Sequence, residues 1–198
     1  MKAAVLYSGG KDSSLAAIIL SKYYDVELVT FVFNPDNPVE SIENAAKLMG
    51  LPWKKQKFDP MLIDTVIEMI LKDKHPANAI NEIHKHALNI LAQEYEIIAD
   101  GTRRDDRVPM RTIAEIQSLE MKFGVSYIRP LLGMGRKEII RICERYFEIV
   151  YGESGSIPNG DFETEIRAEM KKRGIDYSKF FPKDHEQSLI IRKKCDIS

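Results

Sequence analysis

The chain has 198 residues, of which 44% are hydrophobic and 30% are charged, and its formal net charge at pH 7 is −1. This length fits one domain with a small addition, the apolar fraction is enough for a sizeable core, and so small a net charge says little about partners. With Cys143 and Cys195 as the two cysteines, and no Cys-x-x-Cys or Cys/His cluster, the composition excludes a disulfide framework and a zinc site. Residues 1–7 are too short for a secretory signal and no run reaches membrane-spanning length, so we expect a cytoplasmic protein that contacts no membrane.

Apolar segments typical of strands alternate along the chain with segments of helical apolar spacing. The strands that we predict lie at residues 3–7, 26–33, 53–58, 96–99 and 125–131. The helices that we predict lie at residues 13–24, 39–49, 60–72, 78–94, 112–123 and 136–147. The strand at 26–33 is almost continuously apolar, as in a sheet covered on both faces, whereas 53–58 alternates like a strand nearer an edge. The repeated β-α order predicts an α/β fold, a doubly wound, mainly parallel five-stranded sheet with helices on both faces.

The first strand-to-helix junction carries Ser-Gly-Gly-Lys-Asp-Ser-Ser at residues 8–14. Adjacent glycines let the backbone approach a ligand closely, and a helix that begins directly afterwards points unpaired N–H groups at an anion. The serine hydroxyls can donate further bonds to phosphate oxygens, Lys11 adds a cation, and Asp12 fits if Mg²⁺ lies between its carboxylate and the phosphates. The segment therefore predicts a phosphate-binding loop; the alternative is a Gly-rich turn whose Ser and Asp side chains cap a helix.

The spacing at residues 8–14 matches neither a Walker loop nor a dinucleotide-binding loop. The pattern Ser-Gly-Gly-x-Asp-Ser resembles the signature of the PP-loop ATP pyrophosphatases, the adenine nucleotide alpha hydrolase superfamily, and the likeness covers roughly residues 1–147. The resemblance implies a Rossmann-like fold with ATP and Mg²⁺ as cofactors. It also implies cleavage of ATP between the α- and β-phosphates, attachment of AMP to a substrate oxygen, and displacement of AMP by ammonia or sulfur.

Residues 100–111 follow a predicted strand and concentrate four arginines and three aspartates. Arginine offers planar contacts for phosphate, and Asp105 or Asp106 could hold the metal. The alternative is a solvated loop whose charges pair among themselves. Residues 101–106 are similar to the Gly-Thr-x-x-Asp-like stretch of sulfur-transferring members of the superfamily.

Residues 128–132, Ile-Arg-Pro-Leu-Leu, and 136–140, Arg-Lys-Glu-Ile-Ile, resemble a segment of the tRNA-sulfurating PP-loop enzymes with looser spacing. Arg129 at a strand end and Lys137 at a helix start could reach phosphates, or they belong to solvated surface. Between residues 101 and 145, ten basic against six acidic residues leave an excess of four positive charges. Such a patch can follow an RNA backbone, although ATP alone would also explain several of these residues.

These patterns give one set of predicted site residues. The catalytic residues that we predict are Lys11, Asp12 and Arg107. The Mg²⁺ ligands that we predict are Asp12, Asp105 and Asp106. The nucleotide-binding residues that we predict are Ser8, Gly9, Gly10, Lys11, Asp12, Ser13, Ser14, Phe33, Gly101, Thr102, Arg103, Arg111, Arg129 and Lys137. Phe33 is included because the resemblance implies that the backbone at the end of the second strand contacts adenine.

The chain changes character in its last quarter, which we predict to be a small C-terminal helical appendix at residues 150–198, packed on the PP-loop ATP-binding domain at residues 1–149. Residues 152–160 are rich in Gly, Ser and Pro and indicate a loop. Asp161 is a good N-cap for a helix that runs to about residue 173.

We interpret the end of the chain as a tail packed for stability. The alternative is that it folds back over the ATP site and brings His185, Gln187 or Ser188 to the substrate.

The cysteines bear on the choice of reaction, because an in-chain sulfur relay needs an accessible, activated thiol near the nucleotide. Cys143 shares a predicted helical face with apolar residues, which indicates a buried structural thiol, and Cys195 lies close to the end of the chain. Sulfide, a sulfur-carrier protein or an ammonia-supplying protein would then provide the nucleophile. We predict an adenylating ATP pyrophosphatase, with a tRNA base among the candidate acceptors. The alternative is a non-catalytic ATP-binding sensor or a subunit of a tRNA-modifying complex; the oligomeric state is left open, a homodimer included.

Overall fold

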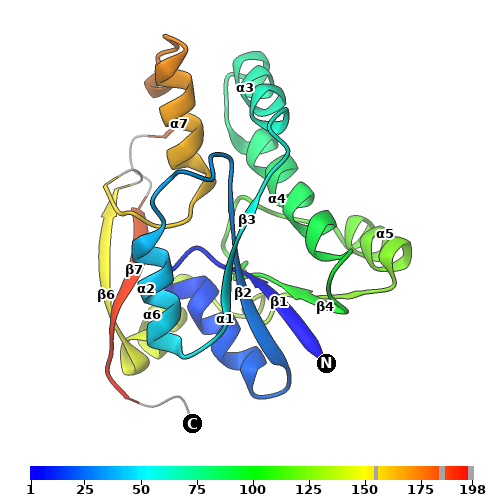
Figure 1. The fold of residues 1–198 in the computed structure, drawn as a ribbon, viewed down its shortest axis with the longest axis vertical. Coiled ribbons are helices and arrows are strands. Elements are labelled where there is room, and N and C mark those ends of the chain that lie inside the picture. Colours follow the sequence, from blue (N-terminus) through cyan, green and yellow to red (C-terminus); the bar gives the residue numbers. More distant parts are fainter. Residues whose placement is uncertain (154–155, 183–185, 196–198) are drawn as a thin grey trace.

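The computed structural model describes residues 1–153, 156–182 and 186–195, and its central element is a parallel five-stranded sheet (Figure 1). The strands are β1 (Lys2–Leu6), β2 (Asp25–Val32), β3 (Trp53–Lys57), β4 (Ile97–Ala99) and β5 (Ser126–Ile128). They lie in the order β3-β2-β1-β4-β5, so the direction of winding reverses between β1 and β4. The predicted doubly wound α/β sheet is confirmed, and ligands of such sheets bind beyond the carboxyl ends of the strands at this reversal.

Helices cover both faces of the sheet. Their bounds are α1 (Lys11–Ser21), α2 (Glu40–Met49), α3 (Leu62–Asp73), α4 (Ala77–Leu91), α5 (Ile113–Phe123), α6 (Arg136–Tyr146) and α7 (Phe162–Lys172), with a short 3-10 helix at Tyr177–Lys179. Helices α3, α4 and α7 contribute buried residues to the core on one face, and α1 and α2 to the core on the other. Helix α6 packs against α1.

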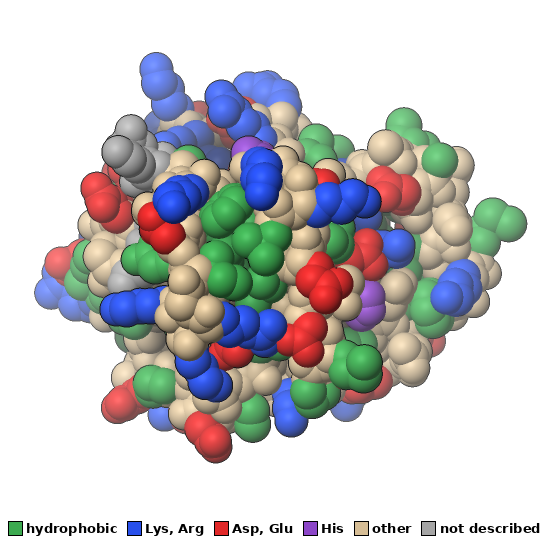
Figure 2. All heavy atoms as spheres, turned by 90° about the horizontal axis from the view of Figure 1, so that it is seen from above, with side chains coloured by type: hydrophobic (Ala, Val, Ile, Leu, Met, Phe, Trp, Pro, Cys, Tyr) green, Lys and Arg blue, Asp and Glu red, His purple; other side chains and the backbone are tan. Residues whose placement is uncertain are grey.

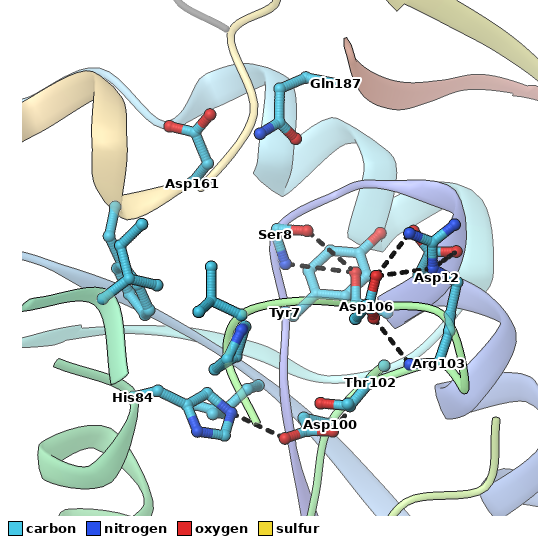
Figure 3. Close-up of a pocket in the computed structure, with 18 of the residues that line it drawn as sticks. Tyr7, Ser8, Asp12, His84, Asp100, Thr102, Arg103, Asp106, Asp161 and Gln187 are labelled. Atoms are coloured by element: carbon cyan, nitrogen blue, oxygen red, sulfur yellow. Dashed lines mark hydrogen bonds and ion pairs between the residues drawn. The ribbon is translucent and has the colours of Figure 1, made fainter. Parts of the chain in front are cut away.

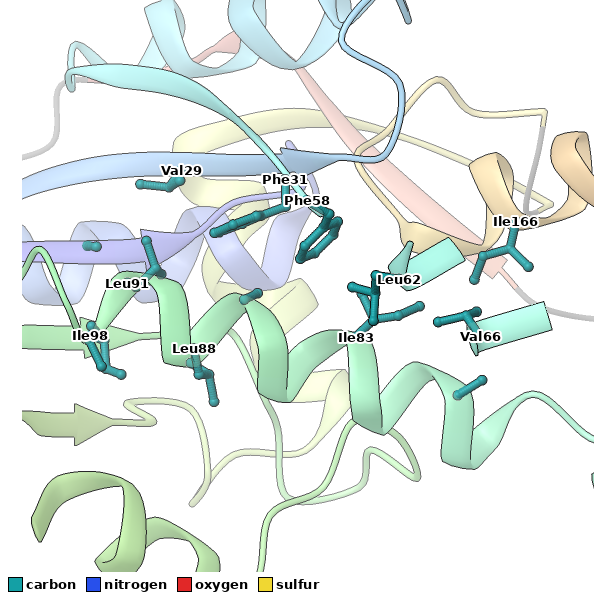
Figure 4. Packing of buried hydrophobic residues seen from close by; sticks show 14 of the residues in the cluster. Val29, Phe31, Phe58, Leu62, Val66, Ile83, Leu88, Leu91, Ile98 and Ile166 are labelled. Carbon is teal, nitrogen blue, oxygen red and sulfur yellow. The ribbon is translucent and has the colours of Figure 1, made fainter. Parts of the chain in front are cut away.

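The alternation of side chains along the strands supplies both cores. On β1, Ala4 faces one cluster of buried residues, whereas Ala3 and Val5 face the other. In the first cluster, Phe31 stacks on Phe58 with ring centroids 4.8 Å apart, beside the side chains of α3 and α4 (Figure 4). Burial on both faces explains why β2 reads as an apolar run.

Two boundaries differ from the sequence prediction for local reasons. Strand β5 ends at Ile128 rather than residue 131, because Pro130 cannot donate to a strand ladder and the chain turns there, with Leu132 N–H donating to Arg129 O at 3.2 Å. Helix α1 begins two residues earlier than predicted, since Gly10 is its N-cap.

The C-terminal part contains a strand pair that the prediction of a helical appendix missed. Strands β6 (Phe147–Glu153) and β7 (Glu186–Lys193) pair antiparallel in a second, two-stranded sheet. Strand β6 follows α6 without an intervening turn, and its last residues fall in the segment that we predicted as a loop. The predicted helix after Asp161 is present as α7 and packs against α3 and α4. No helix within the described residues has the length and apolarity needed to cross a membrane.

Candidate functional site

The glycine loop between β1 and α1 is held in shape by its own serines. Gly9 adopts φ 79°, a conformation in which a side chain would be strained. The Ser13 hydroxyl accepts a hydrogen bond from Ser8 N–H at 3.3 Å and donates to the Gly10 carbonyl at 3.2 Å. Ser14 Oγ donates to the same carbonyl at 2.7 Å. The loop is therefore preorganised from within, as the sequence motif predicts for a binding loop.

Two backbone donors at the start of α1 make no hydrogen bond within the described part of the chain, namely the N–H groups of Asp12 and Ser13. The first N–H groups of any helix lack intrahelical partners, and the helix dipole adds partial positive charge at the same place. This end of α1 lies at the carboxyl edge of the sheet, so its N–H groups and its dipole favour the binding of an anion there.

Asp12 presents an oxygen that suits a metal ion. Its Oδ2 accepts from Lys11 Nζ at 3.0 Å, whereas its Oδ1 is buried and makes no hydrogen bond. The guanidinium of Arg103 is the cation paired with Oδ1, and its Nε lies 3.9 Å away. A buried carboxylate oxygen without a hydrogen bond is costly unless a ligand satisfies it, and Mg²⁺ commonly takes one or two such oxygens together with phosphate oxygens.

Arg103 lies among all three aspartates that we predicted as Mg²⁺ ligands. Its Nε is 2.9 Å from Asp106 Oδ1, 3.7 Å from Asp105 Oδ1 and 3.9 Å from Asp12 Oδ1. Asp105 also accepts the Arg136 N–H at 3.0 Å, and this bond, more than the nearby arginines, lowers the pKa of its carboxyl. In the described residues no three His, Cys, Asp or Glu side chains are arranged to hold a metal. Asp12, Asp105 and Asp106 as Mg²⁺ ligands therefore stay a prediction, and Asp12 is the one with a carboxylate oxygen that makes no hydrogen bond.

A buried network lies below the loop that follows β4. His84 Nε2 is 2.7 Å from Asp100 Oδ2, and the same oxygen accepts from the Tyr127 hydroxyl. Thr102 N–H donates to Asp100 Oδ1 at 2.9 Å. Burial alone would raise the pKa of the Asp100 carboxyl, but the hydrogen bond and attraction from His84, with the bonds from Tyr127 and Thr102, lower it to about 2. Asp100 is therefore a carboxylate that fixes both His84 and the start of the loop.

The C-terminal part forms a third side of the site. Ser8 O accepts from Gly160 N–H at 2.8 Å, Gly9 O accepts from Ile190 N–H at 3.0 Å, and Lys11 N–H donates to Ser188 Oγ at 3.2 Å. These three bonds attach the glycine loop to segments more than 140 positions later in the chain.

The three sides enclose a cavity of about 280 Å³ (Figure 3), near the lower limit of ordinary ligand sites. Its lining combines an apolar part, including Val29, Phe31 and Phe162, with many polar groups. In Figure 3, Gln187 points from the C-terminal segment toward the space beside Ser8, Asp161 lies on the same side, and His84 and Asp100 lie at the opposite side. The cavity can therefore take a ligand that is partly apolar and partly anionic.

A family model described as "Family of unknown function (DUF7411)" matches residues 1–192. The chain belongs to the DUF7411 family. An uncharacterized protein of Methanocaldococcus jannaschii, MJ0690, is 42% identical over 198 residues, which is 100% of this chain and 98% of that protein. A crystal structure of a predicted subunit of tRNA methyltransferase from the same organism is 41% identical with TM-score 0.90, over 99% of this chain and 100% of that one.

A more distant relative of this DUF7411 protein is a probable tRNA sulfurtransferase of Caldanaerobacter subterraneus, 25% identical over 211 residues. The match covers 96% of this chain but 54% of that protein, so the DUF7411 chain spans about half of the sulfurtransferase.

About half of the predicted residues line the cavity of the DUF7411 protein. They are Ser8, Lys11, Asp12, Ser13, Gly101, Thr102, Arg103 and Asp106. Gly9, Gly10 and Ser14 shape the glycine loop without lining the cavity, and Ser14 is fully buried.

Six predicted residues lie off the cavity lining, and one of them, Asp105, is exposed. Arg107 and Lys137 are exposed and outside the cavity. Arg111 bonds the Asn81 carbonyl and pairs with Glu115 at 3.0 Å, so it joins α4 to α5. Arg129 packs over the Tyr127 ring, 5.7 Å from its centroid. Arg111 and Arg129 therefore stabilise the fold around the site. The charge pattern of the sequence could not distinguish this structural role from contact with phosphate.

Phe33 lies at a different surface hollow, between the end of β2 and α7. Its N–H, which we expected near adenine, donates to Glu165 Oε2 at 2.9 Å, and the Asn34 N–H donates to Oε1 at 3.1 Å. A carboxylate from α7 thus satisfies the backbone donors at the end of β2.

Sequence reasoning missed several cavity residues. His84 is on the buried face of α4 and looked like a core position; only its partner Asp100, brought close by the fold, distinguishes it. Gln187 and Ser188 were named in the fold-back alternative, which their positions now support over the passive tail. His185 lies outside the described residues.

Neither cysteine lies on the cavity lining. Cys143 is buried beneath α1 and its Sγ donates to Lys11 O at 3.3 Å. Burial, with repulsion from the Asp12 carboxylate, raises the pKa of this thiol to about 12. Cys195 follows β7 at the end away from Ser188, and five residues of strand place Lys193 about 16 Å from Ser188. The prediction of a buried structural Cys143 is confirmed.

Proposed function

We propose that this DUF7411 protein binds ATP in the cavity and, with Mg²⁺, transfers the AMP group to an oxygen of an acceptor. The observation that carries the proposal is the juxtaposition at the start of α1. The N–H groups of Asp12 and Ser13 make no hydrogen bond with the described residues, and in the same helical turn the buried Asp12 Oδ1 makes none either. Donors for an anion next to an oxygen for a cation are complementary to a metal-bound polyphosphate.

The chemistry that this arrangement supports is nucleotidyl transfer. The acceptor oxygen attacks the α-phosphorus, the bond to the β-phosphate oxygen breaks, and pyrophosphate leaves with that electron pair. The N–H groups at the start of α1, the Ser8 hydroxyl and the Lys11 ammonium would hold the phosphates, and Arg103 would add a planar cation. When bound, Mg²⁺ neutralises charge on the departing pyrophosphate, and Asp12 would hold it.

The adenosine has a suitable apolar surface on the β2 side of the cavity. Val29, Phe31 and Phe162 lie there, and Asp161 adds a polar group from the N-terminus of α7. We assign the adenosine to this side of the cavity. The Phe33 N–H, which we expected near adenine, already donates to Glu165.

A tRNA is the acceptor class that the relatives favour, since two of them are a predicted tRNA methyltransferase subunit and a probable tRNA sulfurtransferase. Basic side chains are also placed to support it. Helix α6 begins at Arg136, which lines the cavity. Along this helix every fourth residue from position 137 is basic and exposed, namely Lys137, Arg141 and Arg145. Four residues of helix rise about 6 Å. On the face shown in Figure 2, Lys and Arg side chains, mixed with acidic ones, surround a central apolar patch.

The sulfur or nitrogen would come from outside the chain. The buried Cys143 thiol, with its raised pKa, is a poor nucleophile, and Cys195 is remote from the cavity. Sulfide, a sulfur-carrier protein or an ammonia-supplying protein would displace AMP from the acceptor.

A second candidate function is an ATP-binding subunit of a tRNA-modifying complex that does not cleave ATP. It is favoured by one observation, namely that the M. jannaschii structure which shares this fold over its whole length is a predicted subunit of tRNA methyltransferase.

Product analysis separates the two candidates. Purified protein is incubated with ATP and Mg²⁺, with and without total tRNA, and AMP plus pyrophosphate is resolved from ADP plus phosphate. We expect AMP that increases with tRNA, and its loss by at least about 100-fold in Asp12→Asn, while Asp36→Asn in an exposed loop behaves as wild type. Tight ATP binding without AMP under either condition would favour the non-catalytic subunit.

A further inference from the structure

Ser188 brings a hydroxyl from the last strand into the glycine loop near the start of the chain. Its Oγ accepts the Lys11 N–H at 3.2 Å across 177 positions of sequence. The residue is 4% exposed and lines the cavity. Lys11 is the first residue of α1, so its N–H is one of the helix donors that an anion would otherwise take.

The hydroxyl of Ser188 has a hydrogen left to give. A serine hydroxyl carries one donor and two acceptor lone pairs, and the Lys11 N–H uses one lone pair. Among the described residues nothing accepts the Ser188 hydroxyl hydrogen. The side chain therefore replaces a backbone donor by a hydroxyl donor on a residue that lines the cavity.

The position of this hydroxyl is fixed by the backbone around it. Ile190 N–H donates to Gly9 O at 3.0 Å, and β7 pairs with β6 at Tyr151 and Ser188. A Cβ atom on Gly10 would lie 3.1 Å from Ser188 O and 3.3 Å from Ser188 Oγ, so a side chain at position 10 would have to displace Ser188 by a few tenths of an ångström. Rigid placement is what a binding group needs in order to act without reorganisation.

We propose that Ser188 is a phosphate-binding residue whose hydroxyl bridges the Lys11 N–H and a phosphate oxygen of the nucleotide. The anion site is then built from two ends of the chain, residues 8–14 and strand β7. The proposal rests on the proposed function in taking the cavity as the ATP site, but it concerns binding of the phosphates and not their transfer.

A purely structural role is the competing explanation, since Ser188 also caps a helix whose own N-cap, Gly10, offers no side-chain bond. Loss of a cap would disturb the whole N-terminus of α1 and lower the affinity for every ligand of the cavity. Loss of a phosphate contact would lower the affinity for pyrophosphate and leave the affinity for adenosine unchanged.

The test is calorimetric titration of the full chain with inorganic pyrophosphate plus Mg²⁺ and, separately, with adenosine. We expect Ser188→Ala to weaken pyrophosphate binding on the order of 10- to 100-fold, the effect of one hydrogen bond to a charged group, and to change adenosine binding by less than about twofold. Ser188→Cys, which keeps the size of the side chain but is a weak donor, should show the same selective loss if the alanine variant does not fold. Ser21→Ala, at the other end of α1, should match wild type in both titrations.

Equal losses for pyrophosphate and adenosine would overturn the proposal in favour of a helix cap. Unchanged pyrophosphate affinity, or a wild-type protein that does not bind pyrophosphate, would also overturn it. AMP formation is not part of this measurement, so a protein that binds pyrophosphate through Ser188 but never forms AMP would refute the proposed function and leave Ser188 in place.

Discussion

A Cβ atom on Gly101 would lie 2.7 Å from the carbonyl carbon of Asp12, closer than real side chains approach a backbone. The loop after β4 therefore packs directly against the start of α1, at the reversal of the sheet between β1 and β4. This contact aligns Arg103 with the Asp12 carboxylate. The site therefore needs glycine at position 101, because a side chain would push the loop away from α1. The sequence shows the glycine but not the backbone that it contacts.

The first prediction follows from that contact. Gly101→Ala must separate the loop from α1, because the atoms it meets are backbone and cannot rotate away. We expect a loss of about 1–3 kcal/mol in the free energy of unfolding and at least tenfold weaker ATP binding, measured by denaturant unfolding and calorimetry. Gly133→Ala is the matched control, since a Cβ atom there meets nothing within 4 Å. Wild-type stability in Gly101→Ala would mean that the two segments are not in contact.

Arg103 gives the second prediction, because its guanidinium stands among the carboxylates of Asp12, Asp105 and Asp106. Replacing it by methionine leaves three carboxylates without that cation and removes a phosphate contact. We expect Arg103→Met to bind Mn²⁺ in the absence of nucleotide about tenfold more tightly than wild type, by electron paramagnetic resonance, and to bind ATP more weakly. Arg104→Met removes an exposed neighbouring charge and should change neither affinity appreciably. Unaltered Mn²⁺ affinity would show that Arg103 does not compete for the carboxylates.

The buried Asp100 carboxylate gives a prediction about pH. Its pKa is about 2 in the folded protein against 3.8 in the unfolded chain, so the carboxylate stabilises the fold above pH 3.8. That stabilisation, about 2 kcal/mol, is lost as the pH falls toward 2. We expect Asp100→Asn to be less stable than wild type by at least this amount at pH 7, and the difference to shrink below pH 3.8. Exposed Asp36→Asn provides the control in urea unfolding at each pH. A difference that stays constant down to pH 2 would contradict the shifted pKa.

The sequence was sufficient to predict those parts of the structure that depend on neighbouring residues along the chain. The glycine loop, its strand and its helix follow from residues 3–24, because turn, capping and apolar periodicity are local. The β6–β7 pair was missed because the two strands, Phe147–Glu153 and Glu186–Lys193, are far apart in the sequence and each has a weak pattern on its own. Ser188, on β7, reached the site only through that pairing. Likewise, whether Arg103 or Arg129 faces the cavity depends on tertiary partners, and the composition of each segment carries no information about them.

The exposed basic side chains of α6 give the last prediction, which tests whether the acceptor is RNA. If RNA lies along this helix, Arg141 and Arg145 neutralise phosphates and release counterions. Arg141→Glu/Arg145→Glu should then weaken tRNA binding at least tenfold and reduce the slope of log affinity against log salt by about two, one for each lost contact. ATP binding should be unchanged, because neither side chain lines the cavity.

The control for this surface is Lys22→Glu/Lys47→Glu, the same charge change near the C-termini of α1 and α2. Filter binding across a salt series measures both double variants beside wild type. Equal losses in the two variants would mean that net charge, and not the α6 surface, governs association. No loss in either would direct the search for the acceptor away from RNA and toward a small molecule that enters the cavity whole.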